Sequence, residues 1–387
     1  MTTLGEVPEL RAVQTGPFGT QLKANEYASD GGVPLVSVGE IRAGAVQIND
    51  STPRVSAATI ERLPRFTLTS HDVVVARKGG VERSSWISPE YGPLFLGSDG
   101  IALRFESEVD ARFWGLYLQQ RSCKSWLLQH AAGSTMLSMN GEILRRLPVV
   151  LFDASERKRL AEVLGALDDK IAANRRVAEL AVSLSEGIVS GAFSSQSLPL
   201  EERAQVVMGS SPKGEYLNED GGGVTFFQGV RDFGLLSPTR RVFATQPVRM
   251  AQAGDVLFAV RAPVGEVNVA IEPTCIGRGL AALRAYENPV SFFYTVRASS
   301  HAWNEFQGTG TVFASVNGKE VRQTRLPVID RAAAPEVEER VSAMHVRALG
   351  ALAENEALAK TRDELLPLLM SGRITVRDAQ KRVEGVV

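Results

Sequence analysis

The sequence predicts an α+β protein in which two mixed α/β units in tandem are separated and held by two long antiparallel coiled-coil helices. Three observations lead to this prediction. The chain contains an internal duplication, each copy closes with a long helical pattern, and 387 residues are enough for two or three domains. A duplicated chain of this kind is expected to have pseudo-two-fold symmetry.

The duplication is recognised by strings that match at a nearly constant distance along the chain. HDVVVARKGG at 71–80 matches GDVLFAVRAP at 254–263, and GIALRF at 100–105 matches GLAALRA at 279–285. The equivalent residues, which are 177 to 183 positions apart, are Asp72 and Asp255, Arg104 and Arg284, Asn140 and Asn317, and Ser190-Gly191 and Ser371-Gly372. Such a steady offset over a whole half indicates a tandem duplication.

The globular units are expected to be mixed α/β because short β-branched runs such as VPLVSV and GDVLFAV are separated by Gly, Pro and Asp. A helix is expected around ARFWGLYLQQRSCKSWLLQ, whose aromatic residues are assigned to the core. The predicted boundaries are 1–152 for the first unit, 153–191 for the first long helix, 192–330 for the second unit, 331–372 for the second long helix, and 373–387 for a C-terminal tail.

The two long helices have matching apolar seams. The first is expected to begin at Asp153, with Glu156 completing a capping box, and to end at Gly191. Pro367 is expected to kink or end the second. Steps of three and four residues predict a coiled coil. The residues expected to pair the helices are Leu160, Leu167, Ile171, Asn174 and Leu184 in the first, and Val341, Leu352, Asn355, Leu358 and Leu365 in the second.

The polar seam residues Asn174 and Asn355 are both fifth of nine seam positions. If the helices are antiparallel, their midpoints meet, and the two amides are expected to lie within hydrogen-bonding distance, directly or through one water. The alternative is that each caps a local backbone group or faces solvent.

Composition and missing motifs argue against an enzyme. The chain has no P-loop, no G-x-G-x-x-G, no G-x-S-x-G and no H-E-x-x-H, and its four histidines are scattered. We therefore expect no catalytic residues and no metal. Cys123 and Cys275 lack metal-ligand spacing and are expected to be buried, reduced thiols in a cytoplasmic protein. No signal peptide or membrane span is predicted.

The net charge of −1 does not suit a protein that holds DNA alone through phosphate contacts. It is compatible with a DNA reader whose partners supply much of the electrostatic attraction.

Several strings resemble the specificity subunits of type I restriction-modification systems. They are GALDDKIAANRRVAEL at 165–180, MGSSPKGEYLN at 208–218, FFQGVRDFG at 226–234, VRAPVGEVNVA at 260–270, CIGRGLAALR at 275–284 and LLPLLMSGRI at 365–374. The similarity covers nearly the whole chain, although the opening before Gly19 is short. It implies two target recognition domains that read double-stranded DNA without cutting or modifying it.

The resemblance also implies partners. These are two DNA adenine methyltransferase subunits, which would bind S-adenosylmethionine, and helicase-nuclease restriction subunits; the chain itself is expected to need no cofactor. Two different readers on a fixed spacer would recognise a split, non-palindromic site.

Polar residues in Gly-rich loops are the candidate DNA contacts. Arg and Gln are suited to base edges, and Lys, Ser and Thr to phosphates. The candidates are Lys23, Arg77, Lys78, Arg83, Ser134 and Thr135 in the first unit, and Lys213, Tyr216, Gln228, Arg231, Arg261, Thr309, Thr311 and Lys319 in the second. For Arg278, the family string suggests a structural role.

Three other interpretations stay open. The chain could be a DNA-reading adaptor in another phage-defence assembly, a coiled-coil scaffold that binds proteins, or a nuclease or methyltransferase with a degenerate motif. Neighbouring genes for a methyltransferase and a helicase-nuclease would favour the type I interpretation.

Overall fold

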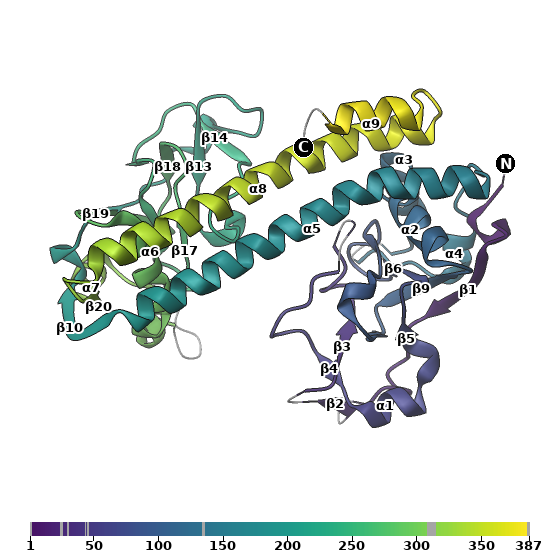
Figure 1. Cartoon of the computed structure of the whole chain (residues 1–387), viewed down its shortest axis with the longest axis horizontal. Helices are drawn as coiled ribbons and strands as arrows, with labels where there is room; N and C mark the ends of the chain where they lie inside the picture. The colour runs from purple at the N-terminus through teal and green to yellow at the C-terminus, as the bar shows by residue number, and fades with distance from the viewer. Residues whose placement is uncertain are drawn as a thin grey trace. The chain divides into compact units, whose positions relative to one another are not determined.

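The computed structural model describes residues 2–23, 26–28, 31–42, 44, 46–133, 136–307 and 315–384, and these form two compact units (Figure 1). Unit 1 comprises Met1–Ile171 and Glu356–Val387, and unit 2 comprises Ala172–Asn355. The long helices α5 (Ala154–Gly191) and α8 (Ala334–Met370) each pass from one unit into the other. Each unit therefore contains one globular part and half of each long helix.

Unit 1 has a four-stranded antiparallel sheet and a five-stranded mixed sheet. In spatial order the first consists of β1 (Leu10–Thr15), β9 (Gly100–Phe105), β6 (Asp72–Ala76) and β7 (Ser84–Trp86). The second consists of β2 (Tyr27–Ala28), β4 (Arg54–Val55), β3 (Val33–Val36), β8 (Leu94–Leu96) and β5 (Thr67–Leu68), and β3 is parallel to β8. The shorter helices are α1 (Ala57–Arg62), α2 (Glu108–Tyr117), α3 (Arg121–His130), α4 (Gly141–Arg145) and α9 (Val376–Glu384).

Unit 2 repeats both sheets in the same order. The four-stranded sheet consists of β11 (Ala204–Met208), β19 (Leu280–Ala285), β16 (Val256–Ala259) and β17 (Val267–Val269). The five-stranded sheet consists of β12 (Leu217–Asn218), β14 (Val242–Ala244), β13 (Val224–Phe227), β18 (Thr274–Ile276) and β15 (Met250–Ala251), again with one parallel pair, β13 and β18. The additional elements are α6 (Pro289–Ala298), α7 (Gly318–Gln323) and the pair β10 (Phe193–Pro199) and β20 (Arg325–Ile329). The predicted duplication and fold class are confirmed.

The duplicated aspartates and arginines form equivalent ion pairs. In unit 2, Arg284 Nε and Nη2 each lie 2.9 Å from a carboxylate oxygen of Asp255. In unit 1, Arg104 Nε lies 3.4 Å from Asp72 Oδ1. Both carboxylates are buried, and burial raises the pKa of Asp72. The repeated residues therefore join equivalent strands of the two sheets.

The duplicated asparagines are helix caps. The side-chain oxygen of Asn140 accepts a hydrogen bond from Ile143 N at 2.8 Å and begins α4. The side-chain oxygen of Asn317 accepts one from Lys319 N at 2.9 Å and begins α7. The shared Asn-Gly string thus marks a repeated N-terminal cap.

The helix expected around residues 111–129 is two helices, α2 and α3. Gln120, at φ −57° and ψ 140°, has left the helical conformation and precedes α3. The side chain of Gln119 donates to the carbonyl of Ser84 at 2.8 Å, which ties the break to β7. Phe113 and Trp114 are fully buried as expected, and Cys123 and Cys275 are both buried and free.

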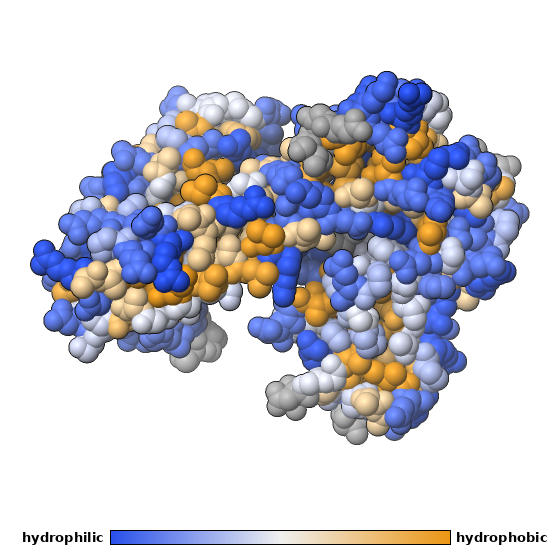
Figure 2. Space-filling model, in the orientation of Figure 1, coloured by the Kyte–Doolittle hydropathy of each residue, from blue (hydrophilic) through white to orange (hydrophobic). Residues whose placement is uncertain are grey.

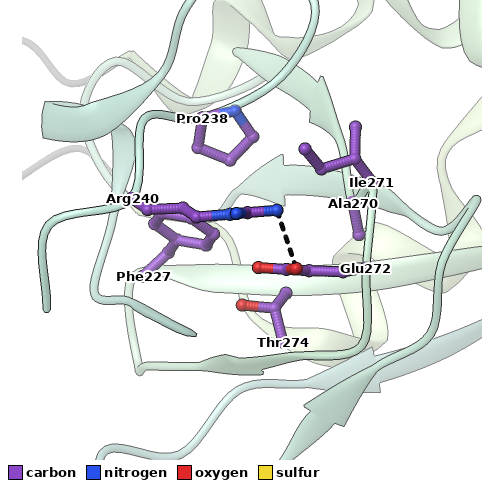
Figure 3. Close-up of a pocket in the computed structure, with 7 residues that line it drawn as sticks. All are labelled: Phe227, Pro238, Arg240, Ala270, Ile271, Glu272 and Thr274. Atoms are coloured by element: carbon purple, nitrogen blue, oxygen red, sulfur yellow. Dashed lines mark hydrogen bonds and ion pairs between the residues drawn. The ribbon is translucent and has the colours of Figure 1, made fainter. Parts of the chain in front are cut away.

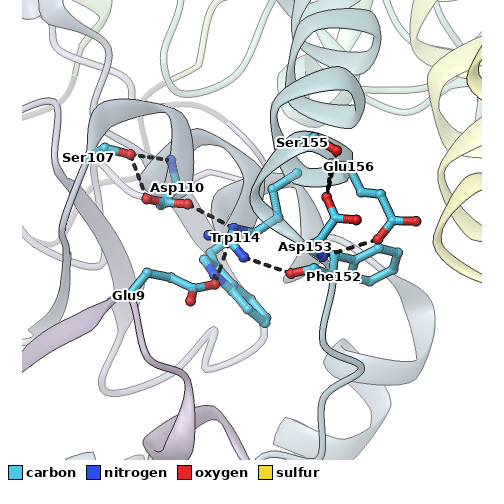
Figure 4. A network of polar contacts seen from close by, with 9 residues as sticks. Glu9, Ser107, Asp110, Trp114, Phe152, Asp153, Ser155 and Glu156 are labelled. Atoms are coloured by element: carbon cyan, nitrogen blue, oxygen red, sulfur yellow. Dashed lines mark hydrogen bonds and ion pairs between the residues drawn. The ribbon is translucent and has the colours of Figure 1, made fainter.

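A polar network attaches the start of α5 to α2 (Figure 4). Asp153 accepts from Glu156 N at 2.8 Å and Glu156 accepts from Asp153 N at 3.1 Å, which is the expected capping box. Arg157 Nε lies 2.8 Å from Asp110 and 3.3 Å from Glu9, both on the globular part of unit 1. The half of α5 in unit 1 is therefore bonded to the domain that precedes it.

Within each unit the two helix halves pack against each other. In unit 1, Asp168 pairs with Arg362 at 2.7 Å, and burial raises the pKa of the Asp168 carboxyl. In unit 2, Asn174 Nδ2 donates to Glu354 at 2.8 Å and Ser185 contacts the sulfur of Met344 at 3.6 Å. Residues later in α5 contact residues earlier in α8, so these helix halves are antiparallel. The seam residues Leu160, Leu167, Val341, Leu358 and Leu365 are buried, and Ile171 and Leu352 are half-buried.

The hydrogen bond that the structure gives Asn174 goes to Glu354, one residue before the expected partner Asn355. Asn174 is buried at 3% exposure, so its amide lies in the helix interface and not in solvent. The direct or water-mediated contact between the two amides stays a prediction.

Leu184 differs from its prediction as a helix-pairing residue, because its side chain is 55% exposed. The buried positions after Asn174 are Ala178, Val182, Ser185 and Val189. The predicted seam leaves Asn174 with a step of three residues, whereas the first buried position, Ala178, is four residues on, so the predicted seam falls one residue too early. Apolar groups also occur among the hydrophilic residues on the face shown in Figure 2.

Replacing Leu184 with Ser is expected to change the free energy of unfolding of unit 2 by no more than about 0.5 kcal/mol, because the side chain is already in water. Replacing Val182, two residues earlier and 4% exposed, with Ser should cost about 2 kcal/mol. Hydrogen exchange of unit 2, followed by mass spectrometry, compares the two positions. A larger loss for the Leu184 variant would restore the predicted seam.

The C-terminal segment differs from a simple tail because it contains α9. Ala379 is fully buried in the core of unit 1, and Ile374, Val376 and Val383 pack against the same core. Thr375 caps the helix by accepting from Asp378 N at 3.2 Å. Before it, α8 continues past the exposed Pro367 to Met370. Among the described residues, no helix is both long enough and apolar enough to span a membrane.

Candidate nucleic-acid interface

Four loops of unit 1 meet beside the ends of β6 and β9, and we call this surface rim 1: residues 16–23, 77–83, 97–99 and 137–139. Backbone hydrogen bonds hold the loops together. Gly16 N donates to Gly100 O at 3.0 Å, Arg77 N to Asp99 O at 2.7 Å, and Met139 N to Arg77 O at 2.7 Å. Residues far apart in the sequence are thus fixed in one surface.

Rim 1 carries cations, an aromatic ring and two acids, Glu82 and Asp99. The Arg77 guanidinium donates to Ser98 O at 3.2 Å and lies 5.3 Å from the centroid of the Phe18 ring. Lys78 Nζ lies 3.1 Å from Asp99 Oδ1. Phe18 is 57% exposed, so the ring is available for stacking or apolar contact.

Unit 2 has the equivalent surface, rim 2: residues 209–213, 228–231, 260–266, 277–279 and 315–319. Its backbone bonds repeat those of rim 1. Gly209 N donates to Leu280 O at 2.9 Å, Val260 N to Gly279 O at 3.0 Å, and Val316 N to Val260 O at 3.0 Å. The two rims therefore share one backbone frame.

Glycine is required where two loops cross in each rim. A Cβ atom on Gly16 would lie 1.8 Å from the carbonyl oxygen of Gly97. A Cβ atom on Gly209 would lie 2.2 Å from the carbonyl oxygen of Gly277. Both distances are far inside van der Waals contact, so any side chain would push the loops apart.

The side chains of rim 2 differ from those of rim 1. Gln228 Oε1 accepts from Ser211 Oγ at 2.7 Å, and Ser211 Oγ accepts from Arg278 N at 3.2 Å. Arg231, Arg261 and Arg278 are exposed, and none of the three makes an ion pair with the residues that the structure describes. Rim 2 thus presents guanidinium groups to solvent.

The other predicted contacts are distributed as follows. Arg83 closes the 77–83 loop and lies 4.0 Å from Glu82, and Lys213 lies 3.8 Å from Glu215. Lys23 and Lys319 are exposed. Tyr216 is half-buried, and its carbonyl accepts from Thr245 N at 3.0 Å. The remaining candidates, Ser134, Thr135, Thr309 and Thr311, lie outside the described residues.

Two rim residues were not among the predicted contacts. Phe18 lies in a Gly-Pro-Phe-Gly turn, where an aromatic residue between glycines is a signal of exposure. Arg278 stands between two glycines, yet its side chain is exposed and makes no ion pair or side-chain hydrogen bond with the described residues. The flanking glycines, and not the arginine, meet the packing requirement of this loop.

A small pocket in unit 2 is lined by Phe227, Pro238, Arg240, Ala270, Ile271, Glu272 and Thr274 (Figure 3). Arg240 Nη2 donates to Glu272 Oε2 at 2.8 Å across it, and Thr225 Oγ1 donates to Glu272 Oε1 at 2.7 Å. The cavity volume of about 10 Å³ is room for one water molecule, which is far too little for a nucleoside.

No protein-family model matches the chain. An alignment of 422 positions relates it, at 25% identity, to the putative type I restriction enzyme MjaX specificity subunit of Methanocaldococcus jannaschii, with 97% of this chain and 96% of that protein covered. The crystal structure of the S subunit of a type I restriction-modification system from M. genitalium is similar at a TM-score of 0.57 and 16% identity, over 95% of this chain and 94% of that chain. The chain is thus similar over nearly its whole length to type I specificity subunits. This similarity extends over both units and is not limited to one of them.

Proposed function

We propose that this chain is a type I specificity subunit, which reads double-stranded DNA at a split, non-palindromic site and directs partner subunits to it. The observation that supports the proposal best is the pair of rims, which share one backbone frame and carry different side chains. Side chains at base edges decide sequence preference, whereas the backbone frame decides position. Two rims of different composition are suited to two different half-sites.

The energetics favour two readers over one. Each mismatched base pair costs about 1–3 kcal/mol, and these costs add for well-separated positions. A single half-site of three or four pairs would recur often in a genome, but two half-sites at a fixed spacing multiply their discriminations. We infer that residues 1–152 and 192–330 are the two target recognition domains, and that 153–191 and 331–372 set the spacing.

The proposed partners supply what this chain lacks. With a net charge of −1, it is poorly suited to hold DNA through phosphates alone. We infer that two DNA adenine methyltransferase subunits, and in some assemblies helicase-nuclease subunits, bind alongside it in the cytoplasm. S-adenosylmethionine would be bound by the methyltransferase, and the specificity subunit would carry no catalytic group.

The proposal predicts that the purified chain alone shows no methylation, cleavage or nucleotide hydrolysis, and that its gene is required for one methylation pattern in the cell. Genome-wide mapping of N6-methyladenine, with and without the gene, should reveal one bipartite motif that disappears on deletion. Complementation with the intact gene is the control. A methylation map that is unchanged by deletion, or activity that persists in the chain freed of all other subunits, would contradict the proposal.

A further inference from the structure

The common backbone frame allows the two rims to be compared residue by residue. Gly97 N donates to Val36 O at 2.8 Å, and Gly277 N donates to Phe227 O at 2.8 Å. Together with the frame bonds given above, this makes the following residues equivalent: Arg77 and Val260, Lys78 and Arg261, Ser98 and Arg278, and Asp99 and Gly279.

These equivalences show a difference in charge. In rim 1, Asp99 pairs with Lys78 at 3.1 Å and partly neutralises it. In rim 2, the position of Asp99 is occupied by Gly279, and Arg278 replaces Ser98. At these four positions rim 1 has the cations Arg77 and Lys78 with the acid Asp99, whereas rim 2 has the cations Arg261 and Arg278 and no acid.

The backbone that carries Arg278 is held firmly, although its side chain is exposed. Its N–H donates to Ser211 Oγ, which in turn donates to Gln228 Oε1. A Cβ atom on Gly277 would lie 2.5 Å from Gln228 Oε1, and one on Gly279 would lie 2.4 Å from Gln228 O. The loop is thus packed against Gln228 on both sides of Arg278, and little backbone freedom is lost when the side chain binds a ligand.

We propose that Arg278 is a further specificity-determining residue, which contacts the edge of a guanine in the half-site read by unit 2. A guanidinium presents two parallel N–H groups that match guanine O6 and N7, and this is the commonest specific contact in the major groove. The inference rests on the proposed function, because it assumes that rim 2 faces DNA.

The test uses the chain assembled with its methyltransferase subunits and a duplex that carries the mapped site. Binding is measured for the cognate duplex and for every single base-pair change, at several salt concentrations. For Arg278→Gln, we expect affinity for the cognate site to fall about ten- to a hundredfold, and preference at one G·C pair in one half-site to be lost. Arg278→Lys should restore part of the affinity but not that preference, because lysine lacks the planar fork.

Arg331→Gln is the matched control, since Arg331 is an exposed arginine of unit 2 that lies outside rim 2. It should leave both half-sites unchanged. A uniform loss of affinity for all sequences after Arg278→Gln, with a shallower salt dependence, would make Arg278 a phosphate contact and overturn the proposal, as would unchanged binding. If the wild-type complex itself shows no sequence preference, the proposed function fails; if it is selective and Arg278→Gln keeps every preference, only this inference fails.

Discussion

Exchanging residues 1–152 for the corresponding segment of a relative with another target is expected to change one half of the methylation motif and to leave the other half intact. Unit 1 has its own four-stranded and five-stranded sheets and its own core, so its rim does not depend on residues 192–330. With about 1–3 kcal/mol for each mismatched pair, three changed pairs would abolish methylation of the original site.

The boundary of the exchanged segment, after residue 152, separates residues that are bonded to each other in the network of Figure 4. Arg157 of α5 pairs with Asp110 and Glu9, which both lie in the exchanged segment. A donor that lacks either acid would leave a half-buried guanidinium without a partner, which would destabilise the attachment of α5. The donor should therefore carry both acids, or the exchange should extend to residue 171.

Sequencing of the methylated genome gives the result directly, and the reciprocal exchange of residues 192–330 is the control. That exchange should alter the other half-site only. If one exchange altered both half-sites together, the model of two independent readers would be wrong.

The fold was predictable because the duplication is strong and involves residues with strict structural roles. Asp72 and Asp255 match because each joins two strands through an arginine, and Asn140 and Asn317 match because each caps a helix. Residues of this kind keep their identity and spacing, so they reveal the repeat. Capping chemistry is also local, which is why the start of α5 at Asp153 could be read from a few residues.

Features that depend on tertiary geometry were predicted less well. Steps of three and steps of four residues both suit a helical seam, so the sequence pattern alone did not decide whether Leu184 or Ser185 faces the partner helix. The sequence also identifies cations in loops but not their partners. Lys78 and Arg261 occupy equivalent positions, yet only Lys78 has an acid beside it, because Asp99 arrives from a loop twenty-one residues away.

The largest expected change in stability comes from Asp255. We expect Asp255→Ala to lower the free energy of unfolding of unit 2 by about 2–3 kcal/mol. The carboxylate is 2% exposed, and it accepts two hydrogen bonds from Arg284 and a third from Gln252 N at 2.8 Å. Alanine would leave all three donors without their acceptor. This loss of unfolding free energy is smaller than for a fully buried ion pair, because the Arg284 side chain is 33% exposed and can reach water.

Asp72→Ala in unit 1 is the matched control, with an expected loss of about 1 kcal/mol. Arg104 Nε lies farther from its carboxylate, at 3.4 Å, and its Nη2 is also satisfied by the carbonyls of Arg65 and Thr67. The pKa of Asp72 is raised by burial, which indicates that its charge is poorly compensated and that its removal costs less. Hydrogen exchange followed by mass spectrometry reports the two units separately, which a single unfolding curve of a two-unit chain would not. Equal losses from the two variants would show that the closer geometry of the Asp255–Arg284 pair does not stabilise unit 2, since distance and hydrogen-bond number are what distinguish the two sites.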